Sequence, residues 1–276
     1  MIIWLASYPK SGNTWIRSLL SAYLFSNDGD FNFELLNNFS QFPSKLYLES
    51  FLNSTKDQKE VYKHWIPAQT KINSNKKRNF LKTHNALCTI DQSAFTNQQN
   101  TSGAIYIVRD PRNVITSLSN HFDLSIKEAF DFFTNERKTI FESDIGNVQY
   151  IGSWADNYKS WKNSNVFPTI IIKYEDLLNN TKETFVKILN FLGEKNEIQN
   201  NNKKIDKAIS SCEFDILKMK EEKEGFRESV ISKKTKKNIN FFHLGKKNDW
   251  KSLLDPDIEK KIREKFSNEM KELGYI

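Results

Sequence analysis

The sequence is poor in the residues that build disulfide frameworks and metal centres. It contains two cysteines, Cys88 and Cys212, and four histidines in 276 residues. Two widely separated cysteines exclude a disulfide-rich secreted scaffold, and we expect both to stay reduced. Neither cysteine lies in a metal-ligand cluster, and the histidines show no metal-binding spacing. We therefore expect no metal site.

A long hydrophobic run is also absent. No apolar stretch approaches the roughly 20 residues that span a bilayer, so no transmembrane segment is predicted. The chain begins directly with a predicted strand, without a basic segment and cleavage site ahead of it. These absences predict a cytoplasmic protein.

Positive charge is in excess. The formal net charge is +7, with 41 Lys and Arg against 34 Asp and Glu. Such a chain suits nucleic acid, an anionic membrane surface or a highly anionic small molecule. The charge is spread along the sequence, and we interpret the densest basic runs, residues 75–78 and 233–237, as solvated loops. The length is sufficient for a substantial core, and we predict a single domain over residues 1–276.

A phosphate-binding loop is predicted near the amino terminus. Residues 1–6 predict a strand, residues 7–15 a tight turn and residues 16–24 an amphipathic helix. Backbone N–H groups at the start of a helix point at one spot, where the helix dipole adds partial positive charge. The alternative is an ordinary strand-to-helix connection with a polar cap. The turn carries a lysine cation, a glycine that permits close backbone approach, and three polar donors: Lys10, Gly12, Ser11, Asn13 and Thr14.

A second strand-turn-helix unit follows in mid-chain. Residues 104–108 form a continuous apolar run, typical of a strand buried on both faces, and Arg109 follows it directly. Asp110 suits a helix cap and Pro111 a first helical position, so a helix is predicted through Leu118. Two such units predict a parallel sheet covered by helices, which binds ligands beyond the carboxyl ends of its strands.

Two further strands are predicted at residues 79–84 and 169–173. The first ends with Lys82 and His84, which face the same side of an extended chain and so point to one site. Residues 26–75 are interpreted as short helices and loops, and residues 91–102 as a polar loop. Helices are predicted at residues 125–141, 154–162, 182–192, 207–224 and 256–273, with a cap at Thr181, a stop at Gly193, and loops at Gly146 and 225–245.

An aromatic stripe runs along the helix predicted at residues 154–162. Trp154, Tyr158 and Trp161 recur at helical spacing. We interpret this stripe as core packing rather than as a ligand site.

Six stretches, in this order, resemble the cytosolic-type sulfotransferases. These enzymes use 3′-phosphoadenosine 5′-phosphosulfate (PAPS) as sulfuryl donor. Each stretch is modestly specific alone, whereas the ordered series is highly specific and spans nearly the whole chain. The resemblance implies an α/β fold of the three-layer P-loop type, with a central parallel β-sheet flanked by helices. The matching stretches are Tyr8–Trp15, Lys82–His84, Tyr106–Val114 with Ser117, Gly152–Trp154, Tyr174–Leu177 and Asn248–Lys251.

The resemblance implies where the donor would bind. Residues 10–14 would hold its 5′-phosphate, and Trp15 would lie against adenine, with helix packing as the alternative role of this ring. Arg109 and Ser117 would hold the ribose 3′-phosphate, because an arginine grips a phosphate through two parallel donors. A structural ion pair is the alternative for Arg109. Further positions that match the family near adenine are Tyr174, Phe214 and Cys212, the last of these where a hydroxyl residue is often found.

The third phosphate-binding stretch departs from the family pattern. The family usually has an arginine, a second basic residue and a glycine, where this chain has His243, Leu244 and Gly245. An imidazole is neutral or partly charged near pH 7. The resemblance therefore implies weaker or more pH-dependent binding of the 3′-phosphate, unless Lys246 or Lys247 compensates.

The chemistry of sulfuryl transfer requires positioned cations and a base. The transferred SO₃ passes between oxygens through a loose transition state, much as in phosphoryl transfer, and needs no metal in principle. By resemblance, Lys10 would stabilise the leaving 3′-phosphoadenosine 5′-phosphate (PAP), and Lys82 would lie near the sulfuryl oxygens. His84 is the candidate base for the acceptor proton, because the pKa of an imidazole lies near working pH. The alternative for His84 is a buried or capping histidine.

The sequence thus predicts a PAPS-dependent sulfotransferase acting on a hydroxyl or an amine. The acceptor stays open between a small molecule and a glycan or lipid hydroxyl, as does the oligomeric state, and residues 26–75 and 120–150 are predicted to shape the acceptor pocket. A P-loop kinase or nucleotidase is the rival enzyme, but its loop would carry a lysine after the second glycine. A non-catalytic basic module that binds nucleic acid is supported only by the net charge, so no nucleic-acid partner is predicted.

Overall fold

The computed structural model describes residues 1–52, 57–142, 147–194, 198, 201–232 and 234–276. The predicted loop at Gly146 and Lys233 of the second basic run lie outside the described residues. The chain divides into two compact units. The first unit comprises residues 1–8, 38–108 and 135–173, and the second unit residues 9–37, 109–134 and 174–276. The single domain over residues 1–276 stays a prediction.

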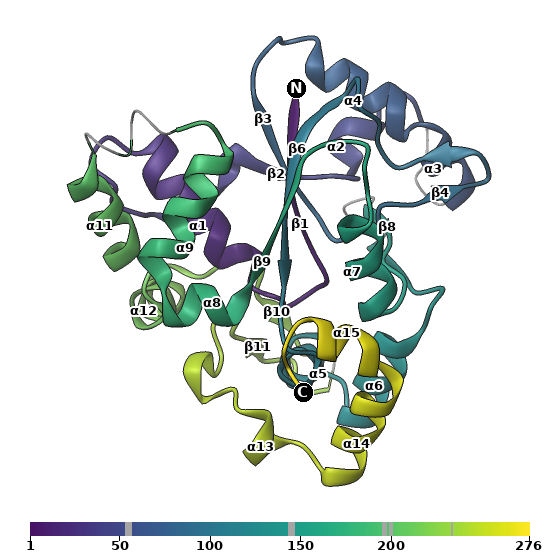
Figure 1. The fold of residues 1–276 in the computed structure, drawn as a ribbon, viewed down its shortest axis with the longest axis vertical. Helices are drawn as coiled ribbons and strands as arrows, with labels where there is room; N and C mark the ends of the chain where they lie inside the picture. Colours follow the sequence, from purple (N-terminus) through teal and green to yellow (C-terminus); the bar gives the residue numbers. More distant parts are fainter. Residues whose placement is uncertain (53–56, 143–146, 195–197, 199–200, 233) are drawn as a thin grey trace. The chain divides into compact units, whose positions relative to one another are not determined.

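The first unit contains a five-stranded sheet in which each neighbouring pair is parallel (Figure 1). Its strands are rich in apolar and β-branched residues, and every residue of β1 is buried, as expected for a sheet covered on both faces. This confirms the predicted α/β fold with a central parallel sheet flanked by helices. In spatial order the strands are β2 (Phe39–Gln41), β3 (Asn79–Thr83), β1 (Ile2–Ser7), β6 (Thr101–Val108) and β9 (Thr169–Lys173).

The carboxyl ends of three adjacent strands lie at one level. Ala6 of β1 pairs with Thr83 of β3 on one side and with Tyr106 of β6 on the other. The strands that follow β1 in the chain, β2 and β3, lie on one side of it, whereas β6 and β9 lie on the other. Open α/β sheets bind their ligands beyond the strand ends at such a switch of direction. The residues that continue β3, β1, β6 and β9 along the chain include His84, Lys10, Arg109 and Tyr174, respectively.

Helix α7 (Trp154–Lys162) packs against β6 and β9 within the first unit. It begins where the Ser153 side chain accepts a hydrogen bond from the N–H of Asp156. Trp154, Tyr158 and Trp161 are buried, which confirms that the aromatic stripe is core. The other elements of this unit are α2 (Lys45–Leu48), α3 (Gln58–Lys63), α4 (Trp65–Asn73) and the strand pairs β4 (Thr89–Ile90) with β5 (Ser93–Ala94) and β7 (Thr139–Glu142) with β8 (Asn147–Tyr150).

The second unit is mainly helical. Helix α1 packs against α11, and α14 lies beside α5 and α6 (Figure 1). Asp110 caps α5 by accepting from the N–H of Arg112, and Pro111 is the first helical residue, as predicted. Its elements are α1 (Asn13–Phe25), η1 (Phe33–Asn38), α5 (Pro111–Phe122), α6 (Ile126–Thr134), α8 (Tyr174–Asn179), α9 (Thr181–Phe191), α11 (Asn202–Ser211), α12 (Phe214–Glu224), β10 (Val230–Ile231), β11 (Asn238–Ile239), η2 (Gly245–Lys247), α13 (Trp250–Leu253), α14 (Pro256–Lys265) and α15 (Ser267–Glu272).

Several predicted boundaries were wrong. The helix predicted at 125–141 ends at Thr134, because the residues of β7 pair with β8 instead of continuing the helix. The helix predicted at 207–224 is two helices, since Glu213, with φ of −59° and ψ of 145°, leaves the helical conformation between α11 and α12. The helix predicted at 256–273 is interrupted at Phe266. Strand β2 lies in the region predicted as helices and loops, where pairing with β3 decides its conformation.

The helix cap predicted at Thr181 is also shifted. Thr181 is the first residue of α9, and Asn180 occupies the cap position. Residues 75–78 and 234–237 are exposed, in agreement with solvated basic loops. No helix within the described ranges is both long and apolar enough to cross a membrane.

Candidate active site

The loop between β1 and α1 has the backbone of an anion-binding turn. Lys10 and Gly12 adopt left-handed conformations, with φ of 66° and 104°. A Cβ on Gly12 would lie 2.5 Å from the ring of Tyr174, so both the conformation and the space require glycine. The N–H groups of Trp15 and Ile16 bond back to the carbonyl of Gly12. The N–H groups of the preceding residues lie at the helix start, where no intrahelical acceptor exists for them.

Two polar atoms at this place fit an anionic ligand. Ser11 Oγ and Arg109 Nε are buried, and neither has a hydrogen-bond partner among the described residues. A buried donor without a partner destabilises a fold by about 1–3 kcal/mol unless a ligand satisfies it. Nη1 of Arg109 donates to the carbonyl of Lys10 at 3.3 Å, which joins the arginine to the loop. A phosphate group is a ligand that both atoms suit.

Three side chains predicted for the donor site contact one another in the second unit. The guanidinium carbon of Arg109 lies 4.2 Å from the centroid of the Tyr174 ring. The Tyr174 and Trp15 rings meet edge to face, with centroids 5.7 Å apart. Within the described ranges no carboxylate forms an ion pair with Arg109, and the cation stacks on an aromatic ring instead. The arrangement therefore differs from the structural ion pair that was the alternative for Arg109.

Cys212 contacts Trp15 through its backbone. Its carbonyl accepts a hydrogen bond of 3.0 Å from the indole N–H of Trp15. The thiol is fully buried, and burial raises the pKa of the Cys212 thiol far above its ordinary value. Cys212 thus orients Trp15, and its side chain is an unreactive thiol.

The His243–Gly245 stretch lies against α12 and close to the loop. A Cβ on Gly245 would be 2.6 Å from the Phe214 ring, so this glycine permits the close packing. The ammonium of Lys10 lies 3.5 Å from the centroid of the Phe241 ring, two residues before His243. Partial loss of hydration lowers the pKa of His243 below its ordinary value, and the cations Lys218 and Lys10 lower it further. His243 is therefore mainly neutral near pH 7 before a ligand binds.

Two of the residues predicted to bind the sulfuryl donor are less closely connected to the other residues predicted for this site. Ser117 lies half-buried in the second turn of α5, and Leu244 is half-buried before η2. Within the described ranges no hydrogen bond joins Ser117 to Arg109. Their roles toward the donor stay predictions.

A carboxylate that sequence analysis missed contacts the loop. The Thr14 hydroxyl donates to Glu228 Oε2 at 3.0 Å and accepts from Arg17 Nη2 at 2.8 Å. Arg17 also forms an ion pair of 2.7 Å with Glu228. The hydroxyl of Thr14 can donate one hydrogen bond, and Glu228 accepts that bond. The signal for this contact was an arginine on an otherwise uncharged helix, since a buried arginine needs an acidic partner.

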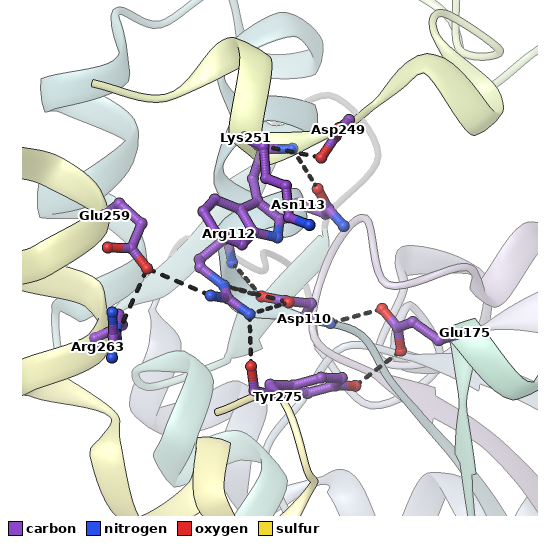
Figure 2. Close-up of polar contacts among 10 residues, drawn as sticks. Asp110, Arg112, Asn113, Glu175, Asp249, Lys251, Glu259, Arg263 and Tyr275 are labelled. Carbon is purple, nitrogen blue, oxygen red and sulfur yellow. Dashed lines mark hydrogen bonds and ion pairs between the residues drawn. The ribbon is translucent and has the colours of Figure 1, made fainter. Parts of the chain in front are cut away.

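A polar network fixes the start of α5, beside Arg109 in the chain (Figure 2). Arg112 Nη2 donates to Asp110 Oδ2 and to the Tyr275 carbonyl, both at 2.8 Å. Glu175 accepts from the Asp110 N–H at 3.0 Å and from the Tyr275 hydroxyl at 2.9 Å. Burial and then Glu175 raise the pKa of Tyr275 far above its ordinary value, so its hydroxyl remains a donor. The network holds the backbone from which Arg109 extends.

His84 belongs to the first unit and follows β3. Its Nδ1 lies 2.8 Å from the Ser7 carbonyl oxygen and 3.2 Å from Ser7 Oγ. A carbonyl only accepts, so this contact favours the tautomer in which Nδ1 carries the proton and Nε2 the lone pair. Lys82 and His84 are both half-buried, while Thr83 between them is buried, as expected for residues that share a side of the chain. Ser7 precedes Lys10 by three positions.

Two buried amides hold the backbone of His84, and sequence analysis missed both. Gln149 Oε1 accepts from the His84 N–H at 2.8 Å, and Asn157 Nδ2 donates to the His84 carbonyl at 2.9 Å. Asn157 also donates to the Ile151 carbonyl and accepts from the Tyr106 hydroxyl, each at 2.8 Å. A polar residue on the apolar face of α7 was the available signal for Asn157. Nothing in the local pattern indicated Gln149.

No group of His, Cys, Asp and Glu side chains that suits a metal ion occurs in the part of the chain that the structure describes. Both cysteines are free thiols.

Comparison with known proteins identifies the family. A family model described as the sulfotransferase domain matches residues 2–274. Sulfotransferase 1B1 of Canis lupus familiaris is 27% identical over 219 residues, which cover 78% of this chain and 65% of the dog protein. Cytosolic sulfotransferase 8 of Arabidopsis thaliana is 26% identical over 273 residues, covering 93% of this chain and 73% of the plant protein.

A solved structure supports the fold. The crystal structure of mouse sulfotransferase SULT7A1 complexed with PAP covers 98% of this chain and 84% of the mouse chain, with a TM-score of 0.60 and 21% identity. At this identity the likeness concerns the fold, which is an α/β fold of the P-loop type. The match to the family model over nearly all of its length shows that this chain belongs to the sulfotransferase domain family.

Proposed function

We propose that this protein transfers a sulfuryl group from PAPS to a hydroxyl or amine acceptor and releases PAP. One observation carries the proposal: the second unit joins the Lys10–Thr14 loop to Arg109 and Tyr174, and the buried atoms Ser11 Oγ and Arg109 Nε have no hydrogen-bond partner among the residues that the structure describes. Orphaned donors beside a cation suit a ligand with several anionic groups. The mouse relative in complex with PAP supports the same choice of ligand.

The donor's groups are assigned to the residues that match their chemistry. The loop of residues 10–14 takes the 5′-phosphate, because its backbone donors and the Lys10 ammonium suit an anion at a helix start. Arg109, with Ser117, takes the 3′-phosphate. Trp15 and Tyr174 provide an aromatic surface for adenine. His243, Leu244 and Gly245 complete the 3′-phosphate subsite.

The reaction then needs one bond exchange and one proton transfer. The acceptor oxygen or nitrogen forms a bond to sulfur while the bond from sulfur to the 5′-phosphate oxygen breaks. The acceptor proton passes to Nε2 of His84, which carries the lone pair in the tautomer favoured by Ser7. Lys10 stabilises the charge that develops on the 5′-phosphate of PAP, and Lys82 that on the sulfuryl oxygens.

The cellular setting belongs to the same proposal. The plant relative carries the word cytosolic in its name, and we place this protein in the cytoplasm as well. The acceptor is proposed to be a small molecule or a glycan or lipid hydroxyl, and no nucleic-acid partner is proposed.

The direct test supplies the purified protein with sulfur-labelled PAPS and an extract of its native cells. We expect label to move to a discrete acceptor that mass spectrometry identifies, and PAP to accumulate in equal amount. PAP should also raise the melting temperature in proportion to the logarithm of its concentration above its dissociation constant. A protein that hydrolyses ATP with magnesium and is indifferent to PAP would instead be a kinase or nucleotidase.

The role of His84 is tested with the acceptor found in this way. We expect His84→Ala to bind PAP within about threefold of wild type and to lose roughly 10²- to 10⁴-fold in turnover, since it removes only the base. Added imidazole should restore part of the rate. Near wild-type turnover of His84→Ala would assign the proton transfer to another group.

A further inference from the structure

One face of α12 holds the segment from Phe241 to Gly245. Phe214, Lys218 and Glu221 are spaced by four and then three residues, so they share a face of the helix. At one end of this face the Phe214 ring lies against Gly245. At the other end the Glu221 carboxylate accepts from the N–H groups of Phe241 and Phe242, at 2.6 and 2.8 Å.

On the helix, Lys218 lies between Phe214 and Glu221. On the segment, His243 lies between Phe242, which is bound to Glu221, and Gly245, which packs on Phe214. Lys218 and Lys10 both lower the pKa of His243, and the Lys10 ammonium lies 3.5 Å from the centroid of the Phe241 ring of the segment. Basic side chains from the first loop, from α12 and from the segment itself are therefore brought to one part of the second unit. Like charges repel at this range, so the arrangement is stabilised when an anion binds among them.

Glu221 is not that anion. Its Oε1 already accepts from the Ser229 hydroxyl and from the Phe241 N–H, and its Oε2 accepts from the Phe242 N–H. These bonds spread its charge over three donors and commit the carboxylate to the segment. Glu221 thus positions the segment, and its carboxylate accepts from these three donors rather than from Lys218.

We propose that Lys218 supplies the permanent positive charge for the 3′-phosphate of the donor, at the place where this chain has His243 instead of the family's arginine. The inference rests on the proposed function and adds a specificity-determining residue to it. An ammonium stays charged throughout the neutral range and offers three donors to phosphate oxygens. The side chain of Lys218 is half-buried, where charge is less screened than in water.

The rival residues are less suited to this role. Lys246 and Lys247, the candidates from sequence analysis, lie in η2 beyond Gly245 and are both exposed. An exposed lysine is hydrated and screened, so it contributes little to an ion pair. The face of α12 places Lys218 opposite the segment itself.

The test compares the binding of PAP and of 5′-AMP, which lacks the 3′-phosphate, by calorimetry. We expect Lys218→Met to weaken the affinity for PAP by roughly 10- to 100-fold and to change the affinity for 5′-AMP by less than about threefold. This is the effect expected when a charged hydrogen bond to one group, the 3′-phosphate, is lost. In turnover, KM for PAPS should rise while kcat at saturating PAPS stays within about threefold. Lys218→Arg should restore the preference for PAP. Lys218→Gln provides a second variant with the same expected loss.

Controls separate this inference from the proposed function. Lys223→Met removes the same charge from an exposed position on α12 and should leave both affinities unchanged. If wild type prefers PAP but Lys218→Met and Lys218→Gln retain that preference, the role of Lys218 is refuted and the function stands. Loss of the preference in Lys246→Met or Lys247→Met instead would assign the charge to η2. If wild type itself binds PAP no better than 5′-AMP, the proposed function fails.

Discussion

At the scale of single residues, the conformation of the first loop depends on side chains distant in sequence. Gly12 needs its left-handed backbone and leaves no room for a Cβ beside Tyr174. Trp15 is held by the Cys212 carbonyl and by the edge of Tyr174. The loop therefore acts through its neighbours as well as through its own donors.

Arg109 should determine the preference for the 3′-phosphate. We expect Arg109→Ala to weaken the affinity for PAP by roughly 10- to 100-fold, because it removes charged hydrogen bonds. The affinity for 5′-AMP should fall by less than about threefold. Competition binding of the two nucleotides measures this ratio. Arg109→Lys keeps the charge but loses the planar fork and the stacking on Tyr174, so it should recover only part of the preference. An unchanged ratio in Arg109→Ala would contradict the assignment.

His243 should make PAP binding depend on pH. Partial loss of hydration, Lys218 and Lys10 hold the pKa of His243 below its ordinary value in the free protein, whereas a bound phosphate favours the charged imidazole and raises that pKa. Binding of PAP therefore takes up a proton. The affinity for PAP rises as the pH falls from the pKa of His243 in the complex toward the pKa of His243 in the free protein. We expect PAP to bind more tightly at about pH 6.5 than at about pH 8.

The phosphate's own ionisation, with a pKa near about 6, acts in the opposite direction and must be subtracted. His243→Arg provides that reference, since its charge is constant. Calorimetry in buffers of different ionisation enthalpy should show proton uptake in wild type beyond that in His243→Arg. Equal pH profiles of the two proteins would show that His243 does not meet the phosphate.

At the scale of elements, α7 has two roles: it packs in the core, and it holds the backbone of His84. Its aromatic stripe packs in the first unit, while Asn157 on the same helix satisfies the carbonyls of His84 and Ile151 and the hydroxyl of Tyr106. A buried polar residue fully satisfied in this way fixes geometry as well as stability.

Asn157→Ala should affect both properties. It leaves three polar groups without their partner, two of them on the buried residues Ile151 and Tyr106, so we expect a loss of about 2–4 kcal/mol in the free energy of unfolding. Turnover should fall roughly 10- to 100-fold through displacement of His84, with PAP affinity unchanged. Urea unfolding, turnover and PAP calorimetry measure the three quantities. Asn163→Ala, at the exposed end of the same helix, is the matched control. Full turnover in Asn157→Ala would limit Asn157 to a structural role.

At the scale of the whole molecule, the last residues of the chain are tied to the start of α5. Arg112 lies under the Trp250 ring at 3.9 Å, pairs with Asp110 and Glu259, and donates to the carbonyl of Tyr275. These contacts connect α5, α13, α14 and the carboxyl terminus within the second unit. The buried guanidinium is thus shared by segments that are far apart in sequence (Figure 2).

Arg112→Met should destabilise the protein by about 3–5 kcal/mol, because it leaves the carboxylates of Asp110 and Glu259 without their buried cation. Arg263→Met is the control, since Arg263 pairs with the same Glu259 but is half exposed, at 53%. It should change stability by less than about 1 kcal/mol. Denaturant titration measures both variants. Equal losses would show that the burial of Arg112 does not matter.

Local patterns were sufficient where one segment carries its own signal. The limits of α7 and β9 agree with the prediction, because a stripe at helical spacing and a β-branched run are complete within a few residues. The cap at Asp110 and Pro111 is equally local. Strand β2 and the pair β7 and β8 were missed, because short strands form only when a partner strand satisfies their backbone groups.

The sequence by itself determined the strand-turn-helix units, the order of the family's motifs and the residue types predicted for the donor site, because each depends on neighbours along the chain. Only the tertiary structure decided that Glu228 holds Thr14, that Asn157 and Gln149 hold His84, and that Glu221 holds the N–H groups of Phe241 and Phe242. These contacts join positions tens to hundreds of residues apart. Their partners are chosen by packing and by the need to satisfy buried polar groups, which no local pattern encodes.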